Sequence, residues 1–274
     1  MERYATVLII GDVCGLAGIK TLEAGLPLLI AREKALFVTV NGENAADGYG
    51  LTQELADRIF ACGADVITSG NHIWEKRDFW LYMESQPRML RPANYPQPAA
   101  GNGSARIEKD GLCFLVINLQ GREYMKPIDC PFRCFDRIFD AETSFKNAGL
   151  QEGAGGKPRR PLVLVDFHAE SVKEKEAFGF YADGRASVVA GTHTHVQTAD
   201  EKLLPLGCAY ITDLGMTGSR AGVIGMKKEI CIKRALSHIQ VRMECAEEDC
   251  AIQGIAVKID VETARALEIK RIEL

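Results

Sequence analysis

The side chains in this sequence that are best suited to bind metal ions come directly after short apolar runs. Each run is typical of a buried β-strand, so each polar residue stands where a strand would end. The set comprises Asp12, Glu43, Asn44, Asn71, His72, His168, His193 and His195. Four of the five histidines belong to it, and only His238 stands elsewhere, on a predicted helix. Carboxylate, carboxamide and imidazole donors gathered in this way indicate a metal site.

Taken one at a time, these residues have ordinary structural explanations. Asp12 is equally well explained as a turn or helix cap, and Asn71 as a turn residue. His193 and His195 could belong to a surface loop, although one intervening residue would place both imidazoles on the same side of an extended segment. Because the whole set falls at strand ends, we interpret it jointly as a site for adjacent metal ions.

The elements that must position these residues alternate between strand and helix. In the first half the patterns predict strands at Ala5–Ile10, Leu36–Val40 and Val66–Thr68, and helices at Leu22–Arg32, Thr52–Ala61 and Trp74–Glu84. This alternation is typical of βαβ units. In open α/β sheets, ligands bind outside the carboxyl ends of the strands, so we expect the polar residues to share one rim.

The second half is predicted to begin with a hairpin, because Asp110-Gly111 separates two apolar runs and favours a tight turn. A glycine- and proline-rich loop is expected at Gly153–Pro161. The further elements predicted are strands Leu162–Asp166 and Ser187–Ala190, helices Val172–Phe178 and Lys227–His238, and tail strands Ile252–Asp260 and Ala266–Glu273. We expect the tail strands to form a second β layer.

Length and composition favour one enzyme domain spanning residues 1–274, because 47% hydrophobic residues suffice for a large core. A net charge of -4 provides no basic field for long nucleic acid, so we expect a small anionic substrate, with RNA left open. The nine cysteines are scattered without a CxxC pair, which predicts buried reduced thiols. Neither a signal peptide nor a membrane span is evident, so we expect a cytoplasmic protein.

Several motifs together resemble the calcineurin-like metallophosphoesterases, in the order typical of that superfamily. They are Gly11-Asp12, Asn41-Gly42-Glu43-Asn44, Gly70-Asn71-His72, Asp166-Phe167-His168 and Gly191-Thr192-His193-Thr194-His195. The segments Arg91–Asn94, Asp183–Ser187 and Thr212–Gly218 resemble the bacterial YmdB-like subgroup, and the resemblance covers nearly the whole chain. The chain departs from the wider superfamily at Asp12-Val13-Cys14, which lacks the histidine of Asp-x-His, and at Glu43, which replaces a bridging Asp.

The resemblance implies a four-layer α-β-β-α sandwich that carries two metal ions. One ion would be held by Asp12, Glu43, Asn44 and His195. The other would be held by Glu43, Asn71, His168 and His193, so that Glu43 bridges. His72 would remain unbound as the general acid, since imidazole is suited to give a proton near neutral pH. Donors of N and O type suit transition metals, and we expect iron, with manganese or zinc as alternatives.

The expected activity is hydrolysis of a small phosphodiester by metal-activated hydroxide, and the YmdB-like resemblance implies a preference for 2′,3′-cyclic nucleotides. Arg122, Tyr124 and Arg185 are further candidates for the substrate pocket, or equally for structural roles. The alternatives are a metal-dependent nuclease or phosphomonoesterase, and a regulatory protein that retains the metal site. A homo-oligomer is a further expectation, based only on how common symmetric assemblies are.

Overall fold

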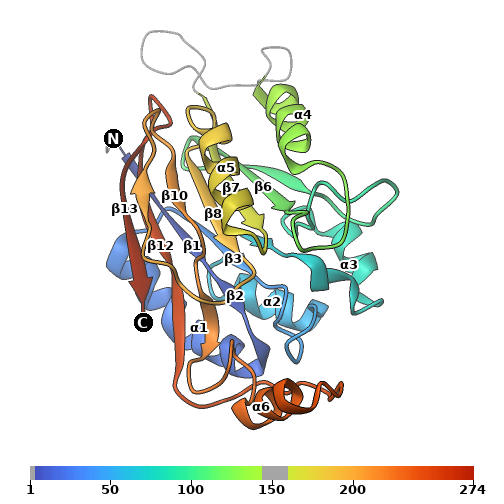
Figure 1. Ribbon diagram of the computed structural model, residues 1–274. Coiled ribbons are helices and arrows are strands. Elements are labelled where there is room, and N and C mark those ends of the chain that lie inside the picture. Colours follow the sequence, from blue (N-terminus) through green and yellow to red (C-terminus); the bar gives the residue numbers. More distant parts are fainter. Residues whose placement is uncertain (1–3, 144–159) are drawn as a thin grey trace.

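The computed structural model describes residues 4–143 and 160–274, and most of its strands form two sheets that face each other (Figure 1). The first sheet has the order β2-β11-β12-β1-β3-β4, with β13 beside β12. Its strands are β1 (Tyr4–Ile10), β2 (Asp12–Val13), β3 (Phe37–Asn41), β4 (Val66–Thr68), β11 (Met216–Ser219), β12 (Cys250–Asp260) and β13 (Ala266–Glu273). The second has the order β5-β6-β7-β8-β10-β9. Its strands are β5 (Ser104–Lys109), β6 (Leu112–Gln120), β7 (Leu162–His168), β8 (Val188–Thr192), β9 (Lys202–Leu203) and β10 (Ala209–Ile211).

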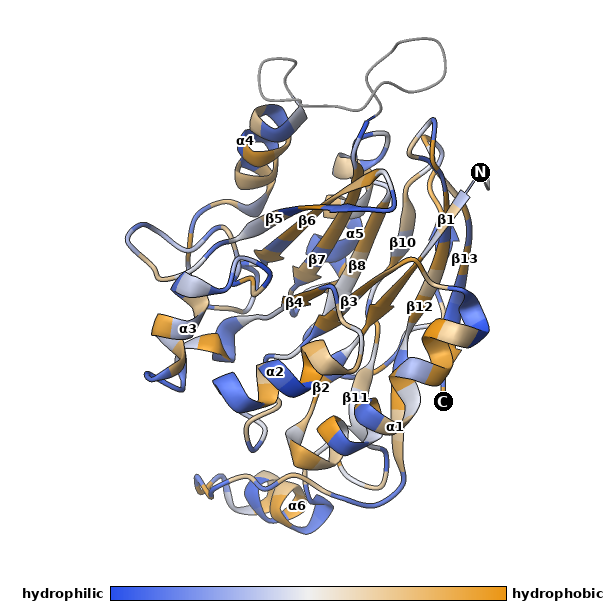
Figure 2. Cartoon of the chain, turned by 180° about the vertical axis from the view of Figure 1, so that it is seen from behind, coloured by the Kyte–Doolittle hydropathy of each residue, from blue (hydrophilic) through white to orange (hydrophobic). Residues whose placement is uncertain are grey.

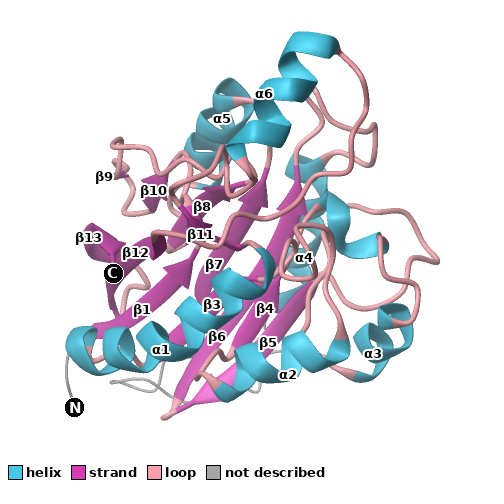
Figure 3. Cartoon of the chain, turned by 90° about the horizontal axis from the view of Figure 1, so that it is seen from below, coloured by secondary structure: helices cyan, strands magenta, loops and turns pink. Residues whose placement is uncertain are grey.

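Helices cover the outer faces of both sheets (Figure 3). They are α1 (Gly15–Glu33), α2 (Gln53–Ala61), the short 3-10 helix η1 (Asn71–Trp74), α3 (Phe79–Ser85), α4 (Pro131–Thr143), α5 (Val172–Ala182) and α6 (Lys228–Ser237). Helices α1 and α2 pack on the first sheet, and α4 and α5 on the second. Among the described helices, none combines the length and apolar composition needed to cross a membrane.

Alternating side chains of the strands create three hydrophobic cores. From β1, Val7 and Ile9 face the second sheet, whereas Leu8 and Ile10 face α1. From β6, Phe114 faces the first sheet and Leu115 faces the outer helices. Three cores separate four layers, and Figure 2 shows these strands as largely hydrophobic. The four-layer α-β-β-α sandwich expected from the resemblance is confirmed.

Most predicted elements of the first half are confirmed, with shifts at their ends. Thr52 caps α2 as predicted, because its side chain accepts a hydrogen bond from the Leu55 backbone N–H. The hairpin is also confirmed, with β5 and β6 antiparallel around Asp110 and Gly111, both at positive φ. The helix predicted from Trp74 begins later, at Phe79, and the chain before it forms η1. Residues 153–159 of the predicted loop lie outside the described residues.

The predicted start of the first helix at Leu22 was wrong, because α1 begins at Gly15. Glycines weaken a helical pattern, but here they allow the helix to approach its sheet closely. A Cβ added at Gly18 would lie 2.3 Å from the Thr217 carbonyl oxygen of β11, and one at Gly25 would lie 2.5 Å from Ile252 Cδ1 of β12.

The prediction that the tail strands form a second β layer was also wrong. Strand β12 inserts into the first sheet, where its residues 254–260 pair antiparallel with the whole of β1. Residues Cys250–Ile252 of β12 pair with β11, and the opposite edge of β12 pairs with β13. Sheet order depends on pairings between residues more than 200 positions apart, which local patterns do not encode. The second layer is built from the middle of the chain instead.

We predict that Phe114→Ala lowers the free energy of unfolding by about 3–5 kcal/mol. The Phe114 ring stacks on Phe37 of the opposite sheet with centroids 4.1 Å apart, and both rings are fully buried. Urea unfolding followed by circular dichroism measures the change. The matched control is Phe180→Ala, whose ring is 54% exposed, and it should change the value by less than about 0.5 kcal/mol. Equal losses in the two variants would contradict the role assigned to the inter-sheet core.

Candidate metal centre

The carboxyl ends of parallel strands from both sheets bring the candidate ligands to one edge. Asp12 opens β2 directly after β1, and Glu43 follows β3. Asn71 opens η1 after β4. From the second sheet, His168 ends β7 and His193 follows β8. The shared rim expected from the strand-end pattern is therefore present.

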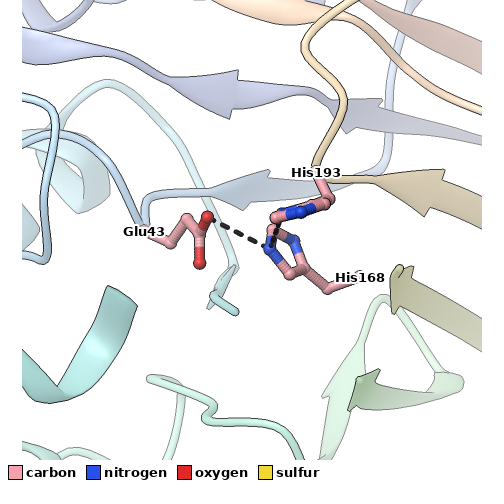
Figure 4. Close-up of side chains that lie close together, drawn as sticks. All are labelled: Glu43, His168 and His193. Carbon is pink, nitrogen blue, oxygen red and sulfur yellow. Dashed lines mark hydrogen bonds and ion pairs between the residues drawn. The ribbon is translucent and has the colours of Figure 1, made fainter. Parts of the chain in front are cut away.

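Four of the candidate ligands meet around His168 Nε2. This nitrogen lies 3.1 Å from Glu43 Oε1, 3.2 Å from Asn71 Oδ1 and 3.0 Å from His193 Nδ1. Figure 4 shows the side chains of Glu43, His168 and His193 pointing toward one another. His168 and Glu43 are fully buried. One ring nitrogen can donate at most one proton, so hydrogen bonding alone cannot satisfy all three neighbours.

The remaining ligands form a second group next to the first. His195 Nε2 lies 3.3 Å from Asp12 Oδ2 and 3.0 Å from Asn44 Nδ2. Asn44 Nδ2 also lies 3.1 Å from Glu43 Oε1, and the His193 backbone N–H donates to Asp12 Oδ2 at 3.2 Å. Glu43 therefore lies between the two groups, which is the place expected of a bridging residue.

Each imidazole in the site has its outer nitrogen fixed by a hydrogen-bond acceptor. His168 Nδ1 lies 2.9 Å from Thr192 Oγ1, whose own hydroxyl donates to Asp166 Oδ1 at 2.7 Å. His168 Nδ1 must therefore be the donor. His195 Nδ1 donates to the Ile224 carbonyl at 2.9 Å, and His193 Nε2 lies 3.2 Å from Glu170 Oε2. All three rings thus direct their remaining nitrogen into the site, as metal-ligating histidines do.

The pKa values follow from the same contacts. Burial lowers the pKa of His195, but the hydrogen bond to Asp12 outweighs it and raises this pKa to about 9. Burial would raise the pKa of Glu43, yet the charge of His168 outweighs it and lowers the value to about 2. Burial, then the charge of His168, lowers the pKa of His193 to about 3. The inner nitrogens of His168 and His195 each face a carboxylate, so protons and cations would compete for the same positions.

Two buried oxygen atoms support the fit of this site to metal ions. Asp12 Oδ1 and Asn44 Oδ1 have no hydrogen-bond partner among the described residues. Leaving buried oxygens unpaired is costly unless a cation completes their environment. A half-turn of the Asn44 carboxamide would exchange its two ends and turn Oδ1 toward Glu43 and His195. The N and O donors suit iron, manganese or zinc.

His72 lies at the edge of this arrangement, in η1. Its backbone N–H donates to Glu43 Oε2 at 3.2 Å, and its ring contacts Tyr49 edge-on with centroids 5.0 Å apart. Its side chain is 27% exposed. Nδ1 is buried, with no hydrogen-bond partner among the described residues. The ring is thus placed beside the donor groups without being engaged by them.

The segment that carries His193 and His195 is not extended, which corrects the argument that both rings lie on one side of a strand-like stretch. Both residues have positive φ, 100° and 64°. The turn sends His193 to the first group and His195 to the second. Asp213 holds this turn, since its Oδ2 accepts from the Thr194 N–H at 3.0 Å and pairs with the buried Lys175 at 2.7 Å.

Some residues that shape the site were missed by sequence reasoning. Thr192 directly precedes His193, and Glu170 follows His168 by two residues, so proximity in the chain was a usable signal. The Ile224 carbonyl gives no such signal, because a backbone oxygen depends on the fold and not on the residue type. Arg185 is not part of this edge: it precedes β8, at the opposite end of that strand from His193.

Comparisons with known proteins agree with the fold. The family model described as YmdB-like protein matches residues 8–272. A 2′,3′-cyclic-nucleotide 2′-phosphodiesterase from Bacillus subtilis (strain 168) is 42% identical over 266 residues, which cover 97% of this chain and 96% of that protein.

Two solved structures are similar over nearly their full lengths. A hypothetical protein from Thermus thermophilus has a TM-score of 0.86 at 35% identity, covering 98% of each chain. A phosphatase from Mycoplasma pneumoniae has a TM-score of 0.88 at 29% identity, covering 100% of this chain and 94% of the other. The match of sequence and fold leads to one conclusion: this chain belongs to the YmdB-like family.

Proposed function

We propose that this chain is a metal-dependent phosphodiesterase that hydrolyses small phosphodiesters, with 2′,3′-cyclic nucleotides preferred. One observation carries the proposal: His168 and His195 direct their inner nitrogens at Glu43 and Asp12, and His193 directs its own at His168, while the outer nitrogens of all three rings are hydrogen bonded elsewhere. The activity named for the Bacillus subtilis relative supports the substrate class. The nine free thiols suit a reducing compartment, so we place the enzyme in the cytoplasm, acting as one domain.

The ligand assignment follows the two groups of donors. Asp12, Asn44 and His195 would hold one ion, and Asn71, His168 and His193 would hold the other, with Glu43 shared between them. Such a pair of cations supplies Lewis acidity toward phosphate oxygens and activates water for in-line attack. We favour iron, with manganese or zinc as alternatives.

The chain keeps the total negative charge of the donor side chains low. It also keeps these side chains in fixed positions. Only Asp12 and Glu43 bring negative charge, because the remaining ligands are carboxamides and imidazoles. The site therefore favours an anionic substrate once divalent ions are bound. Burial of Glu43 and His168 keeps bulk water away from the donors. The fixed outer nitrogens of the three rings prevent the imidazoles from turning away.

His72 is the group that we assign to protonate the leaving alkoxide. The His72 backbone N–H donates to Glu43, which holds the residue beside the site. The His72 ring belongs to neither donor group. Partial exposure lets the ring reach a bound substrate and exchange protons with solvent. An alkoxide leaves poorly unless it receives a proton, and a positioned imidazole can supply one.

The proposal predicts about two transition ions per chain in purified protein, by elemental analysis. Chelation should abolish hydrolysis of 2′,3′-cyclic AMP, and one particular metal should restore it. His168→Ala should lower the metal content, whereas His238→Ala, on an exposed position outside the site, should leave it unchanged.

The same assay separates the alternatives. The similarity to the phosphatase from Mycoplasma pneumoniae makes phosphomonoesterase activity the second candidate function. Turnover of a chromogenic monoester, with no turnover of 2′,3′-cyclic AMP or a chromogenic diester, would overturn the phosphodiesterase assignment. Metal content without turnover of any of them would favour a regulatory protein.

His72→Ala should lower kcat for 2′,3′-cyclic AMP by about 10²–10⁴-fold. The loss should be much smaller for a bis-nitrophenyl diester, because nitrophenolate leaves without a proton. Metal content, measured in the same preparation, should not change. An equal loss on both substrates, or no loss on either, would refute the general-acid role.

Thr192→Val should weaken metal binding by about 10–100-fold, because His168 loses the acceptor that fixes its ring. Competition against a chelating dye measures the affinity. Thr192→Ser is the matched control, since it retains the hydroxyl and should bind metal like the native protein. Equal affinities for the two variants would show that Thr192 does not orient His168.

A further inference from the structure

A separate cavity lies at the other end of the second sheet from the metal donors. Its volume is about 380 Å³. Strand β7 runs from Val163 in the cavity wall to His168 in the metal site, and β8 begins just after Ala186 of the wall. The cavity is thus separated from the metal edge by the length of these strands, and no proposed ligand lines it.

The wall of this cavity is positively charged. Arg160, Arg185 and Arg265 line it, and none of the described residues in its wall is acidic. Arg185 is already fixed, because its guanidinium donates to Asp136 Oδ1 at 2.6 Å and to the Tyr181 carbonyl at 2.8 Å. The guanidinium groups of Arg160 and Arg265 have no hydrogen bond or ion pair within the described ranges. Unpaired arginines in a wall whose described residues include no carboxylate favour an anion, here in a chain with a net charge of -4.

The remaining walls are apolar and held in place. Phe139, Pro161, Val163 and Leu206 provide the apolar surface. A ligand that used only the arginines would leave this surface uncovered. The cavity therefore suits a molecule with both an anionic group and an apolar body.

The segment Asp183–Ser187, which carries part of the family resemblance but lies away from the metal centre, builds this wall. Asp183 accepts from the Leu206 N–H at 2.8 Å and the Cys208 N–H at 3.0 Å, which fixes the loop between β9 and β10. Ser187 Oγ donates to the Ala264 carbonyl at 2.7 Å and accepts from the Val163 N–H at 3.2 Å. These bonds connect the wall segments to each other, so the cavity exists before any ligand arrives.

We propose that this cavity binds a small organic monophosphate of about the size of a mononucleotide. The volume lies within the usual range of ligand sites, about 300–1,000 Å³, and exceeds what a bare phosphate would fill. Arg160 and Arg265 would bind the phosphate, and the apolar walls would cover the nucleoside. The site is distinct from the metal centre and does not depend on the function assigned there.

The test is calorimetric titration of metal-loaded protein with adenosine 5′-monophosphate. The double variant Arg160→Ala/Arg265→Ala should lose one binding event, with affinity at the cavity reduced by about tenfold or more. Turnover of 2′,3′-cyclic AMP without added ligand should stay unchanged. Arg133→Ala, an exposed arginine of α4 outside the cavity, is the matched control and should bind like the native protein.

The metal site and the cavity are separated by a second variant. His168→Ala should retain the binding event that the double arginine variant loses, so a failure of the phosphodiesterase assignment leaves this test intact. Adenosine and inorganic phosphate should each bind about tenfold more weakly than the monophosphate. Unchanged binding in the double variant would overturn the cavity as the site. Phosphate binding as tightly as the nucleotide would overturn the mononucleotide assignment.

Discussion

The structure depends on one constraint. Several atoms that carry lone pairs must be held close together, at a place where only a positive charge can stabilise them. His168 Nε2 has three acceptor-type neighbours within 3.2 Å, and Asp12 Oδ1 and Asn44 Oδ1 are buried without partners in the described chain. Left alone, such groups would rotate apart or recruit water, because unpaired buried polar atoms are costly. The surrounding fold therefore has to hold each ring and carboxylate from behind.

Much of that support comes from a buried polar network centred on Asp166, behind His168. Its carboxylate accepts from Thr68 at 2.5 Å and Asn41 at 2.9 Å in the first sheet, and from Thr192 at 2.7 Å in the second. Burial raises the pKa of Asp166 to about 6, although the charge of His168 and the hydrogen bonds from Thr68 and Thr192 oppose the rise. The network connects β3 and β4 with β7 and β8, so it fixes how the two sheets are aligned at the edge where the ligands meet. The hydrophobic core between the sheets has no comparable directionality.

The sequence predicted which residues meet at the candidate site better than it predicted how the fold brings them together. Strand-end positions could identify Asp12, Glu43 and His168, because the period of a strand and the end of an apolar run are local properties. The insertion of β12 between β1 and β11 could not be predicted, since it depends on pairing across most of the chain. Glycine misled the prediction at α1, where Gly18 permits close packing on β11 and does not interrupt the helix. The Ile224 carbonyl, which orients His195, has no sequence signature at all.

The turn at His193–His195 brings both histidines to the candidate site, but not by the extended geometry that their spacing suggested. On an extended segment, both rings would reach a pair of metal ions from the same side. Positive φ at both residues instead sends the two rings to different donor groups. This backbone is unfavourable for side chains other than glycine, so something must maintain it. Asp213 does so by accepting from the Thr194 N–H, and Lys175 compensates its buried charge. The salt bridge between Lys175 and Asp213 would contribute little to metal binding directly. It determines where the two histidines point, and through them how the donors divide into two groups.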